Sequence, residues 1–122
     1  MNQVVLLVKI VEAQNVHNMV TVQLFYKFSS GFGEEVMKIL DDLKKDSPVK
    51  FHQEEFNLES RVRKENFYAK KILTKYGTNQ VPFLLFIDEK GEEYAALYNE
   101  HKSFEKQVIE NLVRKGYERN LK

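Results

Sequence analysis

The segment from Val20 to Phe28 constrains the fold more than any other part of the chain. It is rich in β-branched and aromatic residues, which is typical of a buried strand. Polar and glycine residues at 29–33 end it, and the apolar positions from Val36 to Leu43 then follow at helical spacing. Glu34 and Glu35, in the first turn of that helix, complement the positive end of its dipole. The pattern predicts a strand, a tight loop and a helix, as in an α/β fold.

The rest of the chain continues this alternation and then changes to a hairpin. Asp46-Ser47-Pro48 breaks the first helix. A strand over Val49–Phe56 and a helix from Val62 to Tyr76 with Gly77 as its C-cap are predicted next. A β-hairpin of Phe83–Ile87 and Glu92–Tyr98 follows, around a turn at Asp88–Gly91. The last predicted element is a helix that is capped by Ser103 and stopped by Gly116. The first two strands should be parallel, joined by a right-handed crossover.

The apolar run from Val4 to Val11 fits two kinds of element. Its residue types favour a strand. Only the segment Glu12–Met19 separates it from the next strand, and a parallel crossover usually needs about a dozen residues or more. We therefore favour a helix there, with the strand as the alternative. The run is too short to cross a bilayer and lacks the features of a signal peptide, so a cytoplasmic location is expected.

Composition excludes several classes of function. The 122 residues contain no cysteine, which removes disulfides, thiolate metal sites and thiol redox cycling by the chain itself. Lysine and arginine number 19 against 18 acidic residues, so no footprint for nucleic acid or an anionic membrane is expected. His17, His52 and His101 lack metal-ligand spacing. We expect no metal and no cofactor. Without a linker, repeat or low-complexity tract, residues 1–122 should form a single domain.

One stretch resembles the thioredoxin family. It reads Lys-Tyr-Gly-Thr-Asn-Gln-Val-Pro-Phe-Leu-Leu-Phe over residues 75–86 and is followed by Gly91. It is similar to the thioredoxin pattern Lys-Tyr-Gly-x-x-x-Ile/Val-Pro-Thr-Leu-Leu-Leu-Phe with its hairpin glycine. The helix from Glu34 to Asp46 is similar to the one that follows the thioredoxin redox motif. The resemblance covers Val20 to Val113 and implies a four-stranded mixed sheet flanked by helices on both faces.

The same resemblance implies that the redox chemistry is missing. Ser30-Gly31-Phe32-Gly33 stands where the family has Cys-Gly-Pro-Cys, and Ser29 replaces the usual tryptophan. Leu24 falls at the family's buried acid, and Phe83 replaces the threonine after the proline. The resemblance also implies that Pro82 follows a cis peptide bond. The chain is therefore expected to be a redox-inactive member and not a dithiol oxidoreductase.

Ser30 and Phe32 each have a structural and a functional interpretation. Ser30 at a helix start is most simply an N-cap, worth about 1 kcal/mol. The alternative is that its hydroxyl and the helix N-terminus hold a thiol cofactor such as glutathione, as serine does in some glutathione transferases. Phe32, between two glycines, is hard to bury and is expected to be exposed beside Val81 and Pro82. Core packing of Tyr26 or Phe28 accounts for the other aromatic residues of this loop.

These residues lead to one favoured function and two alternatives. The favoured one is a non-catalytic module that binds another protein or an extended peptide. The predicted binding groove consists of Ser30, Gly31, Phe32, Gly33, Val81, Pro82 and Phe83. The rings of Phe32 and Phe83 are expected to line it and to supply the apolar contact. The alternatives are a thiol-cofactor transferase or reductase that uses Ser30, and a structural accessory subunit that does not use the groove. No catalytic residue is assigned, and the oligomeric state is left open.

Overall fold

The computed structural model describes residues 19–30, 32–98 and 104–121. The expected helix at Val4–Val11, the residue Ser103 and the histidines His17 and His101 lie outside these ranges. The prediction that Ser103 caps the last helix is wrong, because that helix begins at Lys106 with Glu105 at its N-cap position. The described elements are β1 (Thr21–Tyr26), the 3-10 helix η1 (Phe28–Ser30), α2 (Phe32–Asp46), β2 (His52–Asn57), α3 (Arg63–Lys75), β3 (Phe83–Ile87), β4 (Glu93–Leu97) and α4 (Lys106–Asn120).

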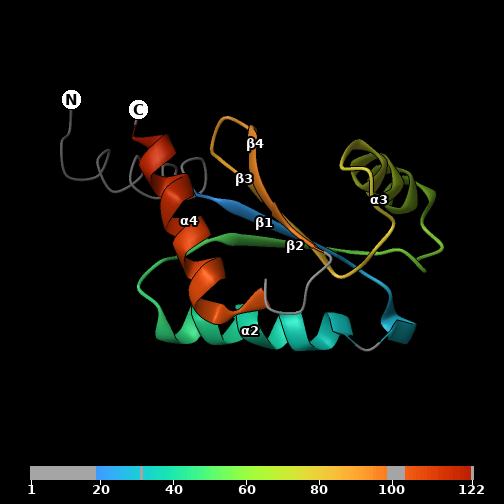
Figure 1. The fold of residues 1–122 in the computed structure, drawn as a ribbon, viewed down its shortest axis with the longest axis horizontal. Helices are drawn as coiled ribbons and strands as arrows, with labels where there is room; N and C mark the ends of the chain where they lie inside the picture. The colour runs from blue at the N-terminus through green and yellow to red at the C-terminus, as the bar shows by residue number, and fades with distance from the viewer. Residues whose placement is uncertain (1–18, 31, 99–103, 122) are drawn as a thin grey trace, which may run out of the picture.

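The four strands form one mixed sheet in the order β2-β1-β3-β4. β1 pairs parallel with β2, with Thr21 opposite His52, and antiparallel with β3, with Phe25 opposite Phe83. β3 and β4 form the antiparallel hairpin. Figure 1 shows α2 and α4 on one side of the sheet and α3 on the other. The expected α/β architecture, with helices on both faces of a four-stranded mixed sheet, is therefore confirmed.

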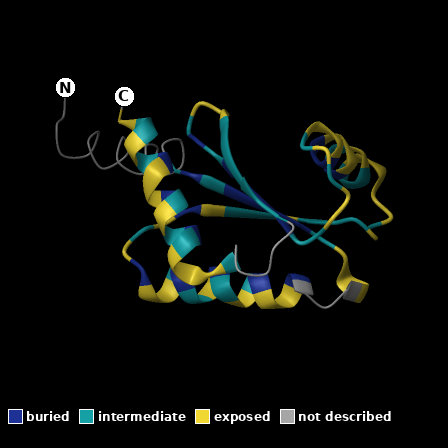
Figure 2. Cartoon of the chain, viewed as in Figure 1, coloured by how far each residue is buried: buried dark blue, intermediate teal, exposed yellow. Residues whose placement is uncertain are grey.

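The core consists of two clusters, one on each face of the sheet. Val22 and Leu24 of β1 pack against α2 and α4, whereas Phe25 packs against α3. Each of these three residues has 0% exposure, so the central strand is buried on both faces. Figure 2 shows the same distribution, with buried residues along the strands and exposed residues on the outer sides of the helices. Among the described helices, none combines the length and apolar character needed to span a bilayer.

Two glycine predictions have different outcomes. Gly77 follows the last turn of α3 with φ of 68°. The N–H of Gly77 donates to the carbonyl of Thr74, and the N–H of Thr78 donates to that of Leu73 (both 3.0 Å), which is a Schellman motif. That prediction is confirmed. The prediction that Gly116 stops the last helix is wrong, because α4 continues to Asn120.

Gly116 is required by packing. A Cβ at this position would lie 2.2 Å from the hydroxyl oxygen of Tyr94 and 2.5 Å from Cγ2 of Val20. The Tyr94 hydroxyl is held there, since it donates to the carbonyl of Leu112 at 2.7 Å. The glycine therefore lets α4 approach the sheet closely, although glycine is a poor helix former.

This packing predicts the effect of Gly116→Ala on stability. In a helix without tertiary contacts the change would stabilise by about 1 kcal/mol. Here the added methyl group overpacks the contact with Tyr94 and Val20, so we expect a loss of about 1–3 kcal/mol in urea unfolding. Lys115→Ala, at an exposed neighbouring position, is the control and should change stability little. A Gly116→Ala variant at least as stable as the wild type would contradict this role of the glycine.

Candidate functional site

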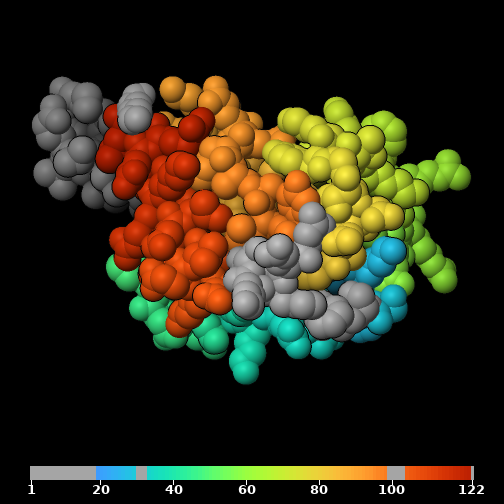
Figure 3. Space-filling model, viewed as in Figure 1, coloured from blue at the N-terminus to red at the C-terminus, as the bar shows by residue number. Residues whose placement is uncertain are grey.

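The candidate site lies where β1 ends, where α2 begins and where the chain enters β3. The pairing of Phe25 with Phe83 places the segment before β3 beside the end of β1. The peptide bond between Val81 and Pro82 is cis, the isomer that the resemblance implies. Both residues are partly exposed. In Figure 3 the end of β1 and η1 (blue) reach the surface near the segments coloured for β3 and α3.

Phe83 does not offer its side chain to this surface. Its exposure is 0%, and its ring stacks on Tyr98 with the centroids 4.9 Å apart. It also meets Phe25 edge-on at 5.7 Å and Tyr76 at 5.3 Å. The expectation that the Phe83 ring lines the groove is therefore wrong, because the ring belongs to the core beneath α3. Only its main chain remains near the site.

Gly33, which the resemblance places at the family's second cysteine, is buried against Tyr26. A Cβ there would lie 2.8 Å from the Cβ of Tyr26 and 3.0 Å from its Cδ2. Tyr26 itself packs on the cluster between the sheet and α2. The tyrosine thus fills the space that a side chain at position 33 would need.

The remaining predicted residues of the loop are only partly described. Gly31 and the side chains of Ser30 and Phe32 lie outside the described part of the chain. The backbone places Ser30 at the end of η1 and Phe32 at the start of α2. The cap or thiol-cofactor role of Ser30 and the exposure of Phe32 therefore stay predictions.

Leu24 stands where the resemblance places the buried acid of the thioredoxin family. Its exposure is 0%, and its neighbours in the cluster are apolar. A leucine cannot accept or donate a proton. Position 24 therefore provides no titratable side chain next to the site.

Sequence reasoning missed the contact that holds the loop after β1. The main-chain N–H of Ser29 donates to Oε1 of Glu59 and its hydroxyl donates to Oε2, both at 2.8 Å. The N–H of Phe28 donates to Oδ1 of Asn57 at 3.4 Å. About thirty residues of sequence separate the partners, and no local pattern indicates the pairing. We call this set of hydrogen bonds the Glu59 clamp.

The clamp favours an ionised Glu59. The hydrogen bonds from the main chain and then the side chain of Ser29 lower the pKa of this carboxyl, and the positive charge of Lys27 adds to the effect. Nearby, the pKa of the Tyr26 hydroxyl is raised, first by burial and then by the negative charges of Glu55 and Glu65.

The described residues offer no metal centre. No group of three or more histidine, aspartate or glutamate side chains converges among residues 19–30, 32–98 and 104–121. His52 is the histidine that lies within these ranges, and its Nε2 is 3.7 Å from a carboxylate oxygen of Glu54.

Comparison with known proteins identifies the fold. A pneumococcal exposed lipoprotein thioredoxin (Etrx1, Streptococcus pneumoniae) is 15% identical with a TM-score of 0.59, covering 84% of this chain and 88% of that one. Thioredoxin O2 of Arabidopsis thaliana is 12% identical with a TM-score of 0.58, covering 90% and 88%. A mutant thioredoxin from Halobacterium salinarum is 13% identical with a TM-score of 0.60, covering 88% of this chain and 82% of that one.

No protein-family model and no curated protein sequence matches. The chain therefore has a thioredoxin-like fold and lacks cysteine.

The Glu59 clamp predicts a pH dependence with a definite sign. The folded pKa of Glu59 lies below its unfolded value, so the clamp stabilises at neutral pH and is lost as the pH falls through the folded pKa. An NMR titration of the Glu59 side-chain carboxyl should therefore give a pKa below the ordinary glutamate value. Ser29→Ala removes one donor and should raise it. An ordinary pKa for Glu59, unaffected by Ser29→Ala, would contradict the clamp.

The Tyr26–Gly33 contact predicts the outcome of restoring the redox motif. Ser30→Cys with Gly33→Cys should lower stability by about 1–3 kcal/mol, because the new side chain overlaps Tyr26. Insulin reduction with dithiothreitol should stay far below that of a true thioredoxin, since Leu24 gives no proton relay. Ser30→Cys alone is the control for stability. A stable double variant with full activity would show that neither Tyr26 nor Leu24 blocks the redox chemistry.

Proposed function

We propose that this chain is a non-catalytic thioredoxin-like module that binds an extended segment of another protein beside Val81 and Pro82. The chemistry available to the chain supports a binding role. Without a cysteine there is no thiolate to attack a disulfide. The positions of the family's second cysteine and buried acid hold Gly33, packed against Tyr26, and the buried Leu24. A cytoplasmic location is part of the proposal and rests on the sequence.

The main chain of Val81 is the observation that carries the proposal. Val81 directly precedes the cis bond and is partly exposed at the start of β3. Within the described part of the chain, no hydrogen bond engages its N–H or its carbonyl group. Main-chain groups that lack a hydrogen bond within the fold are points at which an extended peptide can add as a short strand.

The surrounding side chains suit an apolar contact. Val81 packs on the cluster beneath α3, so its position is fixed by the core. Phe32 is expected to supply an aromatic anchor from the other side of the site. In this proposal the main chain provides the hydrogen bonds, and Val81, Pro82 and Phe32 provide the apolar surface. The buried Phe83 ring takes no part.

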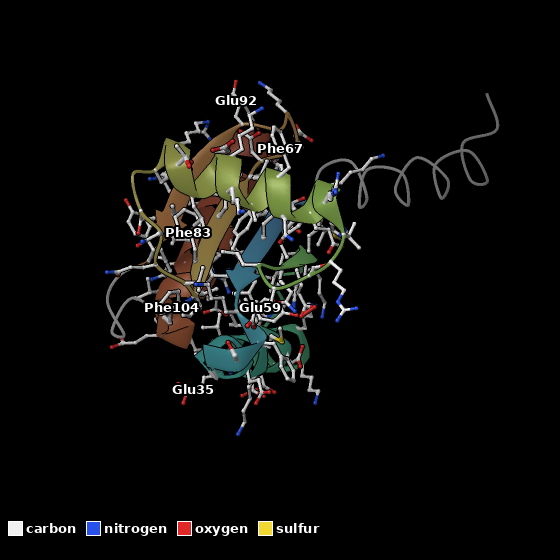
Figure 4. All side chains as sticks on the ribbon, turned by 90° about the vertical axis from the view of Figure 1, so that its right-hand side faces the viewer. Glu35, Glu59, Phe67, Phe83, Glu92 and Phe104 are labelled. Carbon is white, nitrogen blue, oxygen red and sulfur yellow. The ribbon has the colours of Figure 1, made fainter. Side chains whose placement is uncertain are left out.

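Peptides selected from a random display library against the wild-type chain would test the proposal. Loss of a central aromatic anchor costs about 2 kcal/mol or more, so Phe32→Ala should weaken their binding about thirtyfold while leaving the melting temperature nearly unchanged. Phe67→Ala is the matched control, because Phe67 is 74% exposed on α3. Figure 4 shows Phe67 on the outer side of α3, well away from Glu59.

Strand-like pairing can be tested separately on the peptide. N-methylation removes one main-chain donor at a time without changing the side chains. Methylation of the one peptide N–H that donates to the Val81 carbonyl should abolish binding, and methylation of the two neighbouring residues should be tolerated. Uniform tolerance would contradict pairing with Val81. If Phe32→Ala instead costs several kcal/mol of stability, Phe32 is a core residue, and the structural accessory role replaces the binding groove.

A further inference from the structure

A second feature of the same end of the molecule is an apolar cavity that the Val81 site does not use. It has a volume of about 150 Å³ and is lined by Tyr26, Lys27, Phe28, Glu34 and Met37. It lies between the end of β1 and the first turns of α2. We call it the Phe28 pocket. An apolar cavity of about 150 Å³ holds one benzene-sized group, which is close to the size of one large apolar side chain.

Phe28 is exposed and yet held in place. Its exposure is 68%, the opposite of a core residue. Its main chain is fixed by the Glu59 clamp, through Phe28 N–H to Asn57 and the two hydrogen bonds from Ser29 to Glu59. Covering this ring would remove apolar surface from water without the cost of ordering a loop.

The rest of the lining supports an apolar occupant. Tyr26 and Met37 are both partly buried and pack on the core cluster beneath α2. Their inner parts are therefore fixed by the core, while their exposed atoms line the cavity. Methionine is flexible and polarizable, so Met37 can adapt to occupants of slightly different shape.

The charged side chains around the pocket determine which residues of a partner can lie on either side of the apolar side chain that it binds. Lys27 is the cation of the lining, and its charge already acts on Glu59. Glu34 is exposed and makes no ion pair with any residue in the described ranges. The Tyr26 hydroxyl in the same lining is subject to the negative charges of Glu55 and Glu65. The lining itself thus holds one cation and one anion, and the excess of negative charge comes from the acids around it, Glu55, Glu59 and Glu65. Around the pocket, acidic residues outnumber Lys27, although the whole chain has a formal charge of +1.

We propose that the Phe28 pocket binds a single apolar side chain of a partner protein, presented in a segment where lysine or arginine flanks it. The apolar side chain fills the cavity against Phe28 and Met37. The flanking cation approaches Glu34, whose charge also complements the start of α2. This site is separate from Val81, so either proposal can fail without the other.

Defined peptides allow a direct test. The probes are fluorescein-labelled decapeptides with one central leucine in a glycine–serine background, flanked by two lysines, two glutamines or two glutamates. Fluorescence anisotropy should rank them lysine, glutamine, glutamate, with lysine tighter than glutamine by about threefold to tenfold at low salt. Replacing the central leucine by glycine should abolish binding, and added salt should reduce the preference for lysine.

Variants of the chain test whether the peptides bind in the Phe28 pocket. Phe28→Ala should weaken binding of the lysine-flanked peptide about tenfold, and Phe67→Ala, the similarly exposed control on α3, should leave it unchanged. Glu34→Lys should reverse the order of the peptides, so that the glutamate-flanked one binds best. This reversal keeps the test informative even if Phe28→Ala alters folding, because Glu34 is an exposed residue.

Backbone NMR chemical-shift changes on adding the lysine-flanked peptide to the wild-type chain show where the peptide binds. Shifts centred on residues 26–28 and 34–37 support the proposal. Shifts centred on Val81 would overturn it and leave the Val81 site in place. The absence of saturable binding, or equal affinity for all three flanking types, would also overturn it.

Discussion

The structure depends on the burial of β1 on both of its faces. Val22 and Leu24 contribute to the cluster under α2 and α4, and Phe25 contributes to the cluster under α3. The strand also pairs with a neighbour on each edge, parallel with β2 and antiparallel with β3. Because both faces of this strand are packed and both edges are paired, the strand holds the residues that follow it in a defined position. The start of α2, the loop after β2 and the entry to β3 all meet at its carboxyl end.

The sequence was sufficient to predict the architecture because its signals were local. The β-branched run around Leu24, the helical spacing after Gly33 and the turn residues before Glu92 each depend on neighbours in sequence. Gly77 was predictable for the same reason, since a glycine after the last apolar position of a helix is a local signal. Gly116 gives the same signal, but its function is to let α4 approach Tyr94, and that contact is visible only in three dimensions.

The site was less predictable, and two residues explain why. β3 is apolar at every position from Phe83 to Ile87, so alternation could not reveal which face Phe83 occupies. Its ring turned out to be part of the core. Glu59 holds Ser29 across about thirty residues of sequence, and an isolated glutamate after a strand gives no indication of such a partner. In both cases the missing information is tertiary.

The central claim is that the surface at the end of β1 binds protein and carries out no redox chemistry. A crystal structure of the wild-type chain with a display-selected peptide would test it most directly, through the distances between the main-chain atoms of Val81 and those of the peptide. We predict an extended peptide whose carbonyl oxygen and N–H lie within hydrogen-bond distance, about 2.7–3.2 Å, of the N–H and carbonyl oxygen of Val81. A peptide bound on another face, with the main chain of Val81 left in contact with solvent, would contradict it.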